Sequence, residues 1–247
     1  MTRQYLLKPD KLDNRDFLFK ASVGEFPREV DLRSKDIMEI FNQLSLGACG
    51  LFAITQFMMY RMKQDTPSHY YFYLSQLYLY WKTRELEGTI GWDSGISLRD
   101  GLKIAQQVGV CRQSFFPYDI NKFKDKPTPE AEADAANYKV KEYHRIMTVA
   151  QYKSALSEGN PVIMGIEIYD SFTGGEVERT GIVPLPDRNK ESFNGYHGIL
   201  GMGYKLIGNS EYMICRNSWG PVWGDKGYFY LPMDFIGRHV TDMWVAK

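Results

Sequence analysis

Residues 215–228 read CRNSWGPVWGDKGY, and this stretch decides how the rest of the chain is interpreted. Asn217 follows a short β-prone run, at the point where such a strand would end. A side-chain amide there can hold one imidazole nitrogen and leave the other facing a nucleophile, and Trp219 is placed to shield that contact from water. In the alternative, the Asn-Ser, Trp-Gly and Gly-Tyr pairs only build turns. The order and spacing of the whole stretch favour the first interpretation.

A second segment, residues 194–200 (NGYHGIL), places His197 at the start of a glycine-rich apolar strand. An imidazole in this position can accept a thiol proton and return it to a leaving amine. The other histidines, His69, His144 and His239, lie in weaker sequence contexts. From this segment alone, a purely structural histidine stays an open alternative.

A third segment, residues 42–50 (NQLSLGACG), places Cys49 at the start of a predicted helix. The helix dipole and unpaired backbone donors at such a position favour thiolate over thiol. Gln43 lies six residues earlier, where a folded-back loop can aim its side-chain N–H at an oxyanion beside the Cys49 N–H. Taken alone, this pattern also fits a buried packing cysteine.

Together the three segments resemble the papain family of cysteine peptidases. The shared features are the glutamine-to-cysteine spacing of Gln43 and Cys49, a His-Gly strand at His197, and the NSWGxxWGxxGY signature at residues 217–228. The resemblance implies Cys49 as nucleophile, His197 as general acid and base, Asn217 as the residue that orients the imidazole, and Gln43 as oxyanion donor. It covers nearly everything after residue 27.

The chain departs from the usual family pattern around the cysteine. Gly50 stands where most members carry a tryptophan, and Ala48 where many carry a serine. These features, and the lack of a long helical propeptide, are closer to divergent microbial and viral members than to lysosomal, cathepsin-like thiol proteases.

Substrate-binding residues are implied only by the same resemblance. Ser94 and Gly95 stand where the family carries a double glycine that binds extended substrate backbone, and Trp219 lies beside the site. The pocket for the second residue before the scissile bond is expected to be lined by Gly198 and, near the C-terminus, by Thr241 or Asp242. An acidic floor in that pocket would favour basic side chains.

The expected fold is α+β and papain-like, with the active site in a cleft between two lobes. Residues 1–26 form an N-terminal arm, and residues 27–247 form the peptidase domain, divided into a helical lobe over about 27–125 and a β-rich lobe over about 126–247. Apolar spacing predicts helices over 51–63, 74–85 and 97–108, and short strands over 162–168, 197–204, 212–216 and 227–231.

The N-terminal arm carries apolar residues that can anchor it across the cleft, namely Tyr5, Leu6, Leu7, Phe17, Leu18 and Phe19. If it covers the active site, its removal should raise reactivity toward substrate. An arm draped on the surface with no regulatory role is the alternative.

Composition excludes several classes of protein. The 247 residues are 44% hydrophobic and carry 30 basic and 30 acidic side chains, so no net charge attracts nucleic acid or an anionic membrane. Three cysteines are too few for a disulfide framework, and Cys111 and Cys215 are expected to be free and buried. The N-terminus does not resemble a secretory signal, which favours an intracellular site, although a viral or virion-associated protein would look the same.

These observations predict a cysteine endopeptidase that hydrolyses protein or peptide substrates through a thioester acyl-enzyme. No metal or organic cofactor is expected, because no Cys/His spacing typical of a zinc site occurs. Two alternatives remain: a catalytically silent binding module with the same fold, and a thiol transpeptidase or amide ligase that passes the acyl group to an amine.

Overall fold

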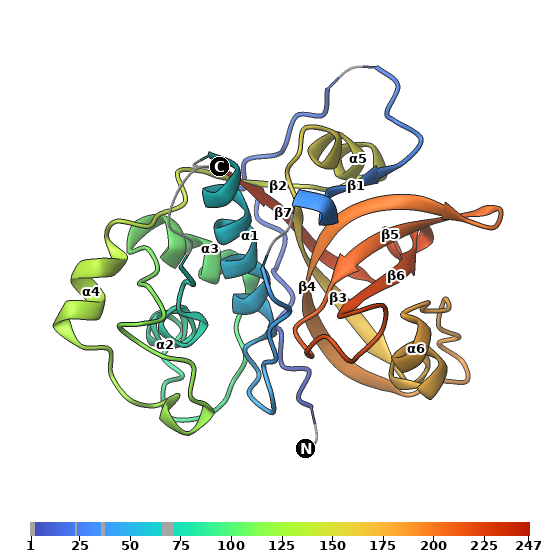
Figure 1. Ribbon diagram of the computed structural model, residues 1–247. Coiled ribbons are helices and arrows are strands. Elements are labelled where there is room, and N and C mark those ends of the chain that lie inside the picture. Colours follow the sequence, from blue (N-terminus) through green and yellow to red (C-terminus); the bar gives the residue numbers. More distant parts are fainter. Residues whose placement is uncertain (1–2, 23, 36–37, 66–71) are drawn as a thin grey trace.

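The computed structural model describes residues 3–22, 24–35, 38–65 and 72–247, and they form two lobes that meet along one long helix (Figure 1). One lobe is helical and the other is built on an antiparallel sheet. The α+β two-lobe fold expected from the sequence is confirmed.

Helices dominate the first lobe, and their apolar sides are buried against one another. The side chains of Ser75 and Ser97 cap two of them by accepting backbone N–H groups three residues later. The three helices predicted from apolar spacing are confirmed to within two residues at each end. The helices of this lobe are α1 (Cys49–Asp65), α2 (Gln76–Leu86), α3 (Leu98–Gln107) and α4 (Pro129–Ala135).

The second lobe is an antiparallel sheet in the order β2-β7-β3-β4-β5-β6, with β1 paired to β4. The predicted strands are confirmed as β3 to β6, and β4 is twice as long as expected. The strands are β1 (Val30–Asp31), β2 (Tyr143–Arg145), β3 (Val162–Tyr169), β4 (Phe193–Ile207), β5 (Ser210–Arg216), β6 (Tyr228–Pro232) and β7 (Val240–Ala246), accompanied by α5 (Val149–Ser157) and α6 (Gly175–Thr180). Short 3-10 turns cover Leu32–Lys35, Ile120–Lys122, Asp170–Thr173 and Met233–Phe235.

The boundary between the lobes differs from the predicted position near residue 125. Helix α4 lies with the helical lobe (Figure 1), and its Asp134 accepts hydrogen bonds from the backbone and guanidinium of Arg112. At the other end, β1 pairs with β4 and therefore belongs to the sheet lobe. Most residues between 121 and 130 are exposed on this lobe, and the chain enters the sheet at β2.

Helix α1 joins the two lobes because β4 approaches its first turn without a side chain in between. A Cβ atom on Gly198 of β4 would lie 2.6 Å from the Cα and the N of Gly50. This glycine-to-glycine contact brings the start of α1 against the strand that carries His197.

The N-terminal arm runs between the lobes and then along the edge of the sheet (Figure 1). It forms isolated parallel bridges from Leu6 to Tyr196, Lys8 to Ser97 and Leu18 to Arg145. Among its predicted anchors, Leu7 and Phe19 are buried, whereas the Phe17 and Leu18 side chains are exposed.

All three cysteines are free and buried, as expected for Cys111 and Cys215. Among the residues that the structure describes, none of the helices combines the length and apolar character needed to cross a membrane.

Candidate active site

Cys49 is the first residue of α1 and is completely buried. Backbone N–H groups of Gly198 and Gly50 donate to its sulfur, and both contacts favour the thiolate. The Gly198 contact comes from β4, so the sulfur lies beside the strand segment that carries His197. Helix start and strand therefore bring together the two residues that the sequence singled out separately.

His197 is held by Asn217, which follows the last residue of β5. The distance between His197 Nε2 and Asn217 Oδ1 is 2.8 Å, and the same oxygen accepts the Ser218 N–H. Because an amide oxygen only accepts, Nε2 carries the imidazole proton. Nδ1 is buried without a hydrogen-bond partner among the described residues, which leaves it as a free base. Trp219 covers the ring, with 4.9 Å between the ring centroids.

Gln43 is buried beside this pair and is fixed from the sheet side. Its Oε1 accepts the Ser218 hydroxyl at 2.6 Å, and its Nε2 donates to the Leu46 carbonyl at 3.0 Å. An amide nitrogen carries two protons, so one N–H remains for another acceptor. Ser218, the residue after Asn217, thus links the glutamine to the segment that holds the imidazole, a role that no sequence pattern indicated.

The loop before Cys49 is held by Asp93, another residue that sequence reasoning missed. Its carboxylate accepts the Gly47 N–H at 3.0 Å and also binds the hydroxyl of Tyr80. The only sequence signal was its place two residues before Gly95. Asp93 thereby fixes the backbone two residues ahead of the sulfur.

Burial sets the protonation states of the pair. It raises the pKa of the Cys49 thiol to about 11, and it lowers the pKa of His197 to about 4 despite the hydrogen bond to Asn217. Both groups are therefore neutral at pH 7. The expected thiolate does not form here, because desolvation outweighs the helix start and the backbone donors.

The N-terminal arm contacts the residues around this pair. The Tyr5 carbonyl accepts the Tyr196 N–H at 3.1 Å, and Leu7 N–H donates to the Tyr196 carbonyl at 3.2 Å. The Tyr5 ring meets the His197 ring edge-on at 6.1 Å, and Arg3 lies 4.4 Å over Trp219. The arm thus contacts both the imidazole and its aromatic cover.

The predicted substrate-binding residues have different surroundings in the structure. Gly95 contacts the arm so closely that a Cβ there would lie 1.7 Å from the Leu6 carbonyl oxygen, and its φ of +64° also favours glycine. Gly198 and Trp219 lie beside Cys49 and His197, as described above. The Ser94 hydroxyl instead donates to the Gly95 carbonyl and is hydrogen-bonded to the Thr89 hydroxyl, which holds the loop together.

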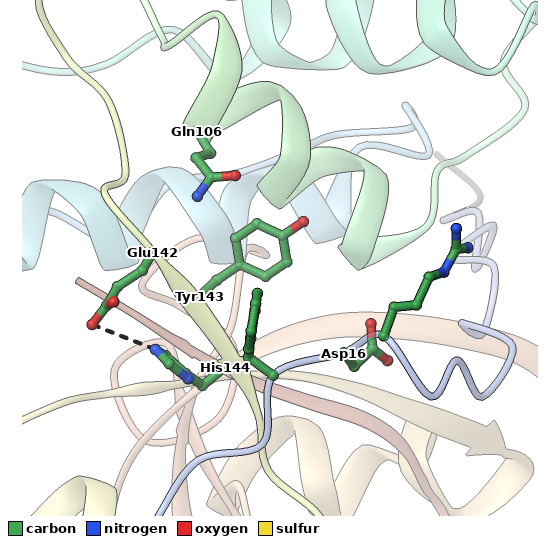
Figure 2. Close-up of a pocket in the computed structure, with 7 residues that line it drawn as sticks. Asp16, Gln106, Glu142, Tyr143 and His144 are labelled. Carbon is green, nitrogen blue, oxygen red and sulfur yellow. Dashed lines mark ion pairs between the residues drawn. The ribbon is translucent and has the colours of Figure 1, made fainter.

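A cavity of about 250 Å³ lies between the arm and the body (Figure 2), and neither Cys49 nor His197 lines it. Its lining includes His144, whose Nε2 lies 3.4 Å from Glu142, and Asp16 of the arm. His239 pairs with Glu167 elsewhere, and His69 lies outside the described residues. Neither described histidine therefore joins Cys49.

Metal binding has no support in the described parts of the chain. No three histidine, cysteine, aspartate or glutamate side chains among those residues converge in a way that could hold an ion.

Comparison with known proteins identifies the family. The model of the papain family cysteine proteases matches residues 26–240, so the chain belongs to that family and is a papain-like cysteine peptidase, a hydrolase. It is 30% identical to an uncharacterised peptidase C1-like protein of Acanthamoeba polyphaga mimivirus, over 97% of this chain and 84% of that protein. It is 26% identical to chymopapain of Carica papaya over 90% of this chain, which spans 59% of that protein.

A solved structure agrees over the whole length. The chain is similar to xylellain, a cysteine protease from Xylella fastidiosa, with a TM-score of 0.90 and 29% sequence identity. The match covers 100% of this chain and 98% of xylellain, so it includes the N-terminal arm.

Proposed function

We propose that this protein is a cysteine endopeptidase in which Cys49, His197, Asn217 and Gln43 hydrolyse peptide bonds through a thioester. The observation that carries the proposal is the hydrogen bond between His197 Nε2 and Asn217 Oδ1. It leaves Nδ1 as the basic nitrogen of an imidazole whose neighbour, Gly198, donates to the Cys49 sulfur. The base and the nucleophile thus lie on adjoining segments, and the hydrogen bond to Asn217 defines the tautomer of the imidazole.

In the first half of the reaction, His197 Nδ1 takes the thiol proton and the sulfur attacks the scissile carbonyl carbon. The carbonyl oxygen gains negative charge and accepts the Cys49 N–H and the remaining Nε2–H of Gln43. When the C–N bond breaks, the imidazolium returns its proton to the leaving amine. The products of this half are a free amine and a thioester on Cys49.

In the second half, water replaces the amine. His197 takes a proton from the water as its oxygen attacks the thioester carbon, and the same oxyanion donors act again. The C–S bond then breaks, the carboxylic acid leaves, and the thiol is restored with the proton from His197. Asn217 keeps the ring in one orientation throughout both halves.

We also propose that the N-terminal arm is an intramolecular cover for this site. Its backbone pairs with Tyr196 and Ile96 on the two sides of the cleft, and the Tyr5 ring contacts His197. A substrate that reaches Cys49 must displace these contacts. The isolated bridges that Leu6 forms with Tyr196 and Lys8 forms with Ser97 are both parallel.

A direct test uses an arm-released form made from the full chain. A recognition sequence for a sequence-specific serine endopeptidase is inserted after Gly24, where a side chain would meet nothing within 4 Å. The chain is folded intact, cut, and diluted so that the arm dissociates. Cleavage of an unfolded protein is then followed by mass spectrometry of the products.

We expect cleavage by the arm-released form, little by the intact chain, none by Cys49→Ser, and normal cleavage by the matched variant Cys111→Ser. Persistent inactivity of the arm-released form would favour the silent binding module. Repeating the assay with an added amine separates hydrolysis from acyl transfer, because a transpeptidase would yield mainly the amide. Cleavage that survives Cys49→Ser would refute the proposed site.

A further inference from the structure

The arm shows what the cleft accepts, because Leu7 fills a pocket beside the catalytic pair. Leu7 is 3% exposed. Its Cδ1 lies 2.8 Å from the position that a Cβ on Gly50 would take, and its Cδ2 lies 2.8 Å from the position that a Cβ on Gly165 would take. The pocket therefore exists because two glycines replace side chains that would close it. The tryptophan usual after the cysteine in this family would occupy the same space.

The wall of this pocket next to the Leu7 methyl groups includes a charged side chain. The Gly165 Cβ position lies 2.7 Å from Thr241 Oγ1 and 3.4 Å from Asp242 Oδ2. Both side chains belong to β7, which pairs with β3 at this point. Asp242 is thus the acidic floor that the resemblance suggested, and its Oδ2 lies near the methyl groups of Leu7.

That carboxylate already has a cationic partner. Arg145 Nη2 on β2 lies 2.9 Å from Asp242 Oδ1, and both side chains are almost completely buried. The Arg145 guanidinium also lies 5.2 Å over the Trp244 ring, which closes the pair from solvent. The floor of the pocket is therefore an internally neutralised ion pair.

The ion pair between Arg145 and Asp242 does not depend on the arm, because neither residue belongs to the arm. When the arm leaves, Asp242 loses the Asp10 N–H at 3.1 Å, and Arg145 loses Asp16 at 3.1 Å. The bond between Arg145 and Asp242 links two neighbouring strands of the sheet and remains. A substrate thus meets a small apolar pocket over a floor without net charge.

We infer that Arg145 is a specificity-determining residue, which neutralises Asp242 and makes the pocket select an aliphatic side chain, such as leucine, over a basic one. The inference rests on the proposed function, and it assigns the pocket to the second substrate residue before the scissile bond. It reverses the expectation from an acidic floor alone. A lysine or arginine would be buried against a carboxylate whose charge is already balanced, so its own desolvation would go uncompensated.

The test compares three peptides that differ only at that residue, which is leucine, arginine or glutamate. The kcat/KM of each is measured with arm-released wild type, Arg145→Met, Asp242→Asn and the double variant, and thermal melting checks that each variant is folded. The same peptides are titrated into the Cys49→Ser form of each variant, so that binding is measured without turnover.

The wild type and the double variant should prefer leucine by about tenfold or more over both charged peptides. Arg145→Met, which leaves Asp242 unpaired, should gain about tenfold for arginine, and Asp242→Asn, which leaves Arg145 unpaired, should gain similarly for glutamate. Unchanged preferences in both single variants would overturn the inference, as would a wild type that prefers arginine. If the Cys49→Ser form binds the leucine peptide but the arm-released wild type never cleaves it, only the proposed function is refuted.

Discussion

Shortening Leu7 should unmask the active-site cysteine in the intact chain. The side chain is buried between Gly50 and Gly165, and the rest of the arm stays in place in Leu7→Ala. Truncating a buried leucine costs about 2–5 kcal/mol in protein cores. We take the lower end, about 2 kcal/mol, because only the docked arm loses the contact. Each 1.4 kcal/mol is a factor of ten, so the undocked fraction should rise about 30-fold.

The measurement is the rate at which iodoacetamide labels Cys49 at pH 7, resolved by peptide mass mapping. When the arm opens and closes quickly compared with labelling, the rate follows the undocked fraction. The arm-released form gives the upper limit of the rate. Leu18→Ala is the matched control, because Leu18 is on the same arm but 58% exposed.

The reasoning fails if Leu7→Ala labels no faster than Leu18→Ala while the arm-released form labels rapidly. In that case the arm would be held by its polar contacts and not by the pocket. If the arm-released form is as slow as the intact chain, the arm is not the cover, and the burial of Cys49 has another source.

Three further predictions concern the site itself. Ser218→Ala should lower kcat by about tenfold with little change in KM, because it removes the hydrogen bond that fixes Gln43. Steady-state kinetics of the arm-released form measure both constants, and a change in KM alone would contradict the prediction. Gly198→Ala should destabilise the fold by about 1–3 kcal/mol in urea unfolding, because the new methyl group meets the Gly50 backbone; unchanged stability would mean that β4 can move away. Burial raises the pKa of the Cys49 thiol in the intact chain to about 11, against an ordinary value of 9.0, so docking of the arm favours the thiol and should weaken as pH rises toward 11; labelling of the intact chain that reaches a plateau below pH 9 would contradict this sign.

The parts of the site that could be predicted from sequence are those that have a recognisable pattern within one short segment. Cys49 at a helix start and Asn217 at a strand end each follow from local patterns, and the apolar spacing of α1 is clear within its own 17 residues. That they belong to one site was predicted only through the family signature, because two segments 168 positions apart share no local signal.

The parts that could not be predicted depend on contacts between distant residues. Ser218 and Asp93 position Gln43 and the cysteine loop through side-chain bonds to other elements. The neutral protonation states follow from burial in the folded chain, whereas the helix start alone predicts a thiolate. Strand β7 was not predicted because Asp242 interrupts its apolar pattern. The ion pair with Arg145 explains why an acid is present in that buried strand.

The arm also completes the sheet. β2 is the outermost strand next to β7, and the arm pairs with its free side: Arg145 N–H donates to the Phe17 carbonyl, and Phe19 N–H donates to the Arg145 carbonyl. Unpaired strand edges are templates for association with other chains. Release of the arm would therefore expose an unpaired strand edge together with the cleft. The arm-released form would then be more prone to self-association, and the intact chain would be better suited to accumulate at high concentration.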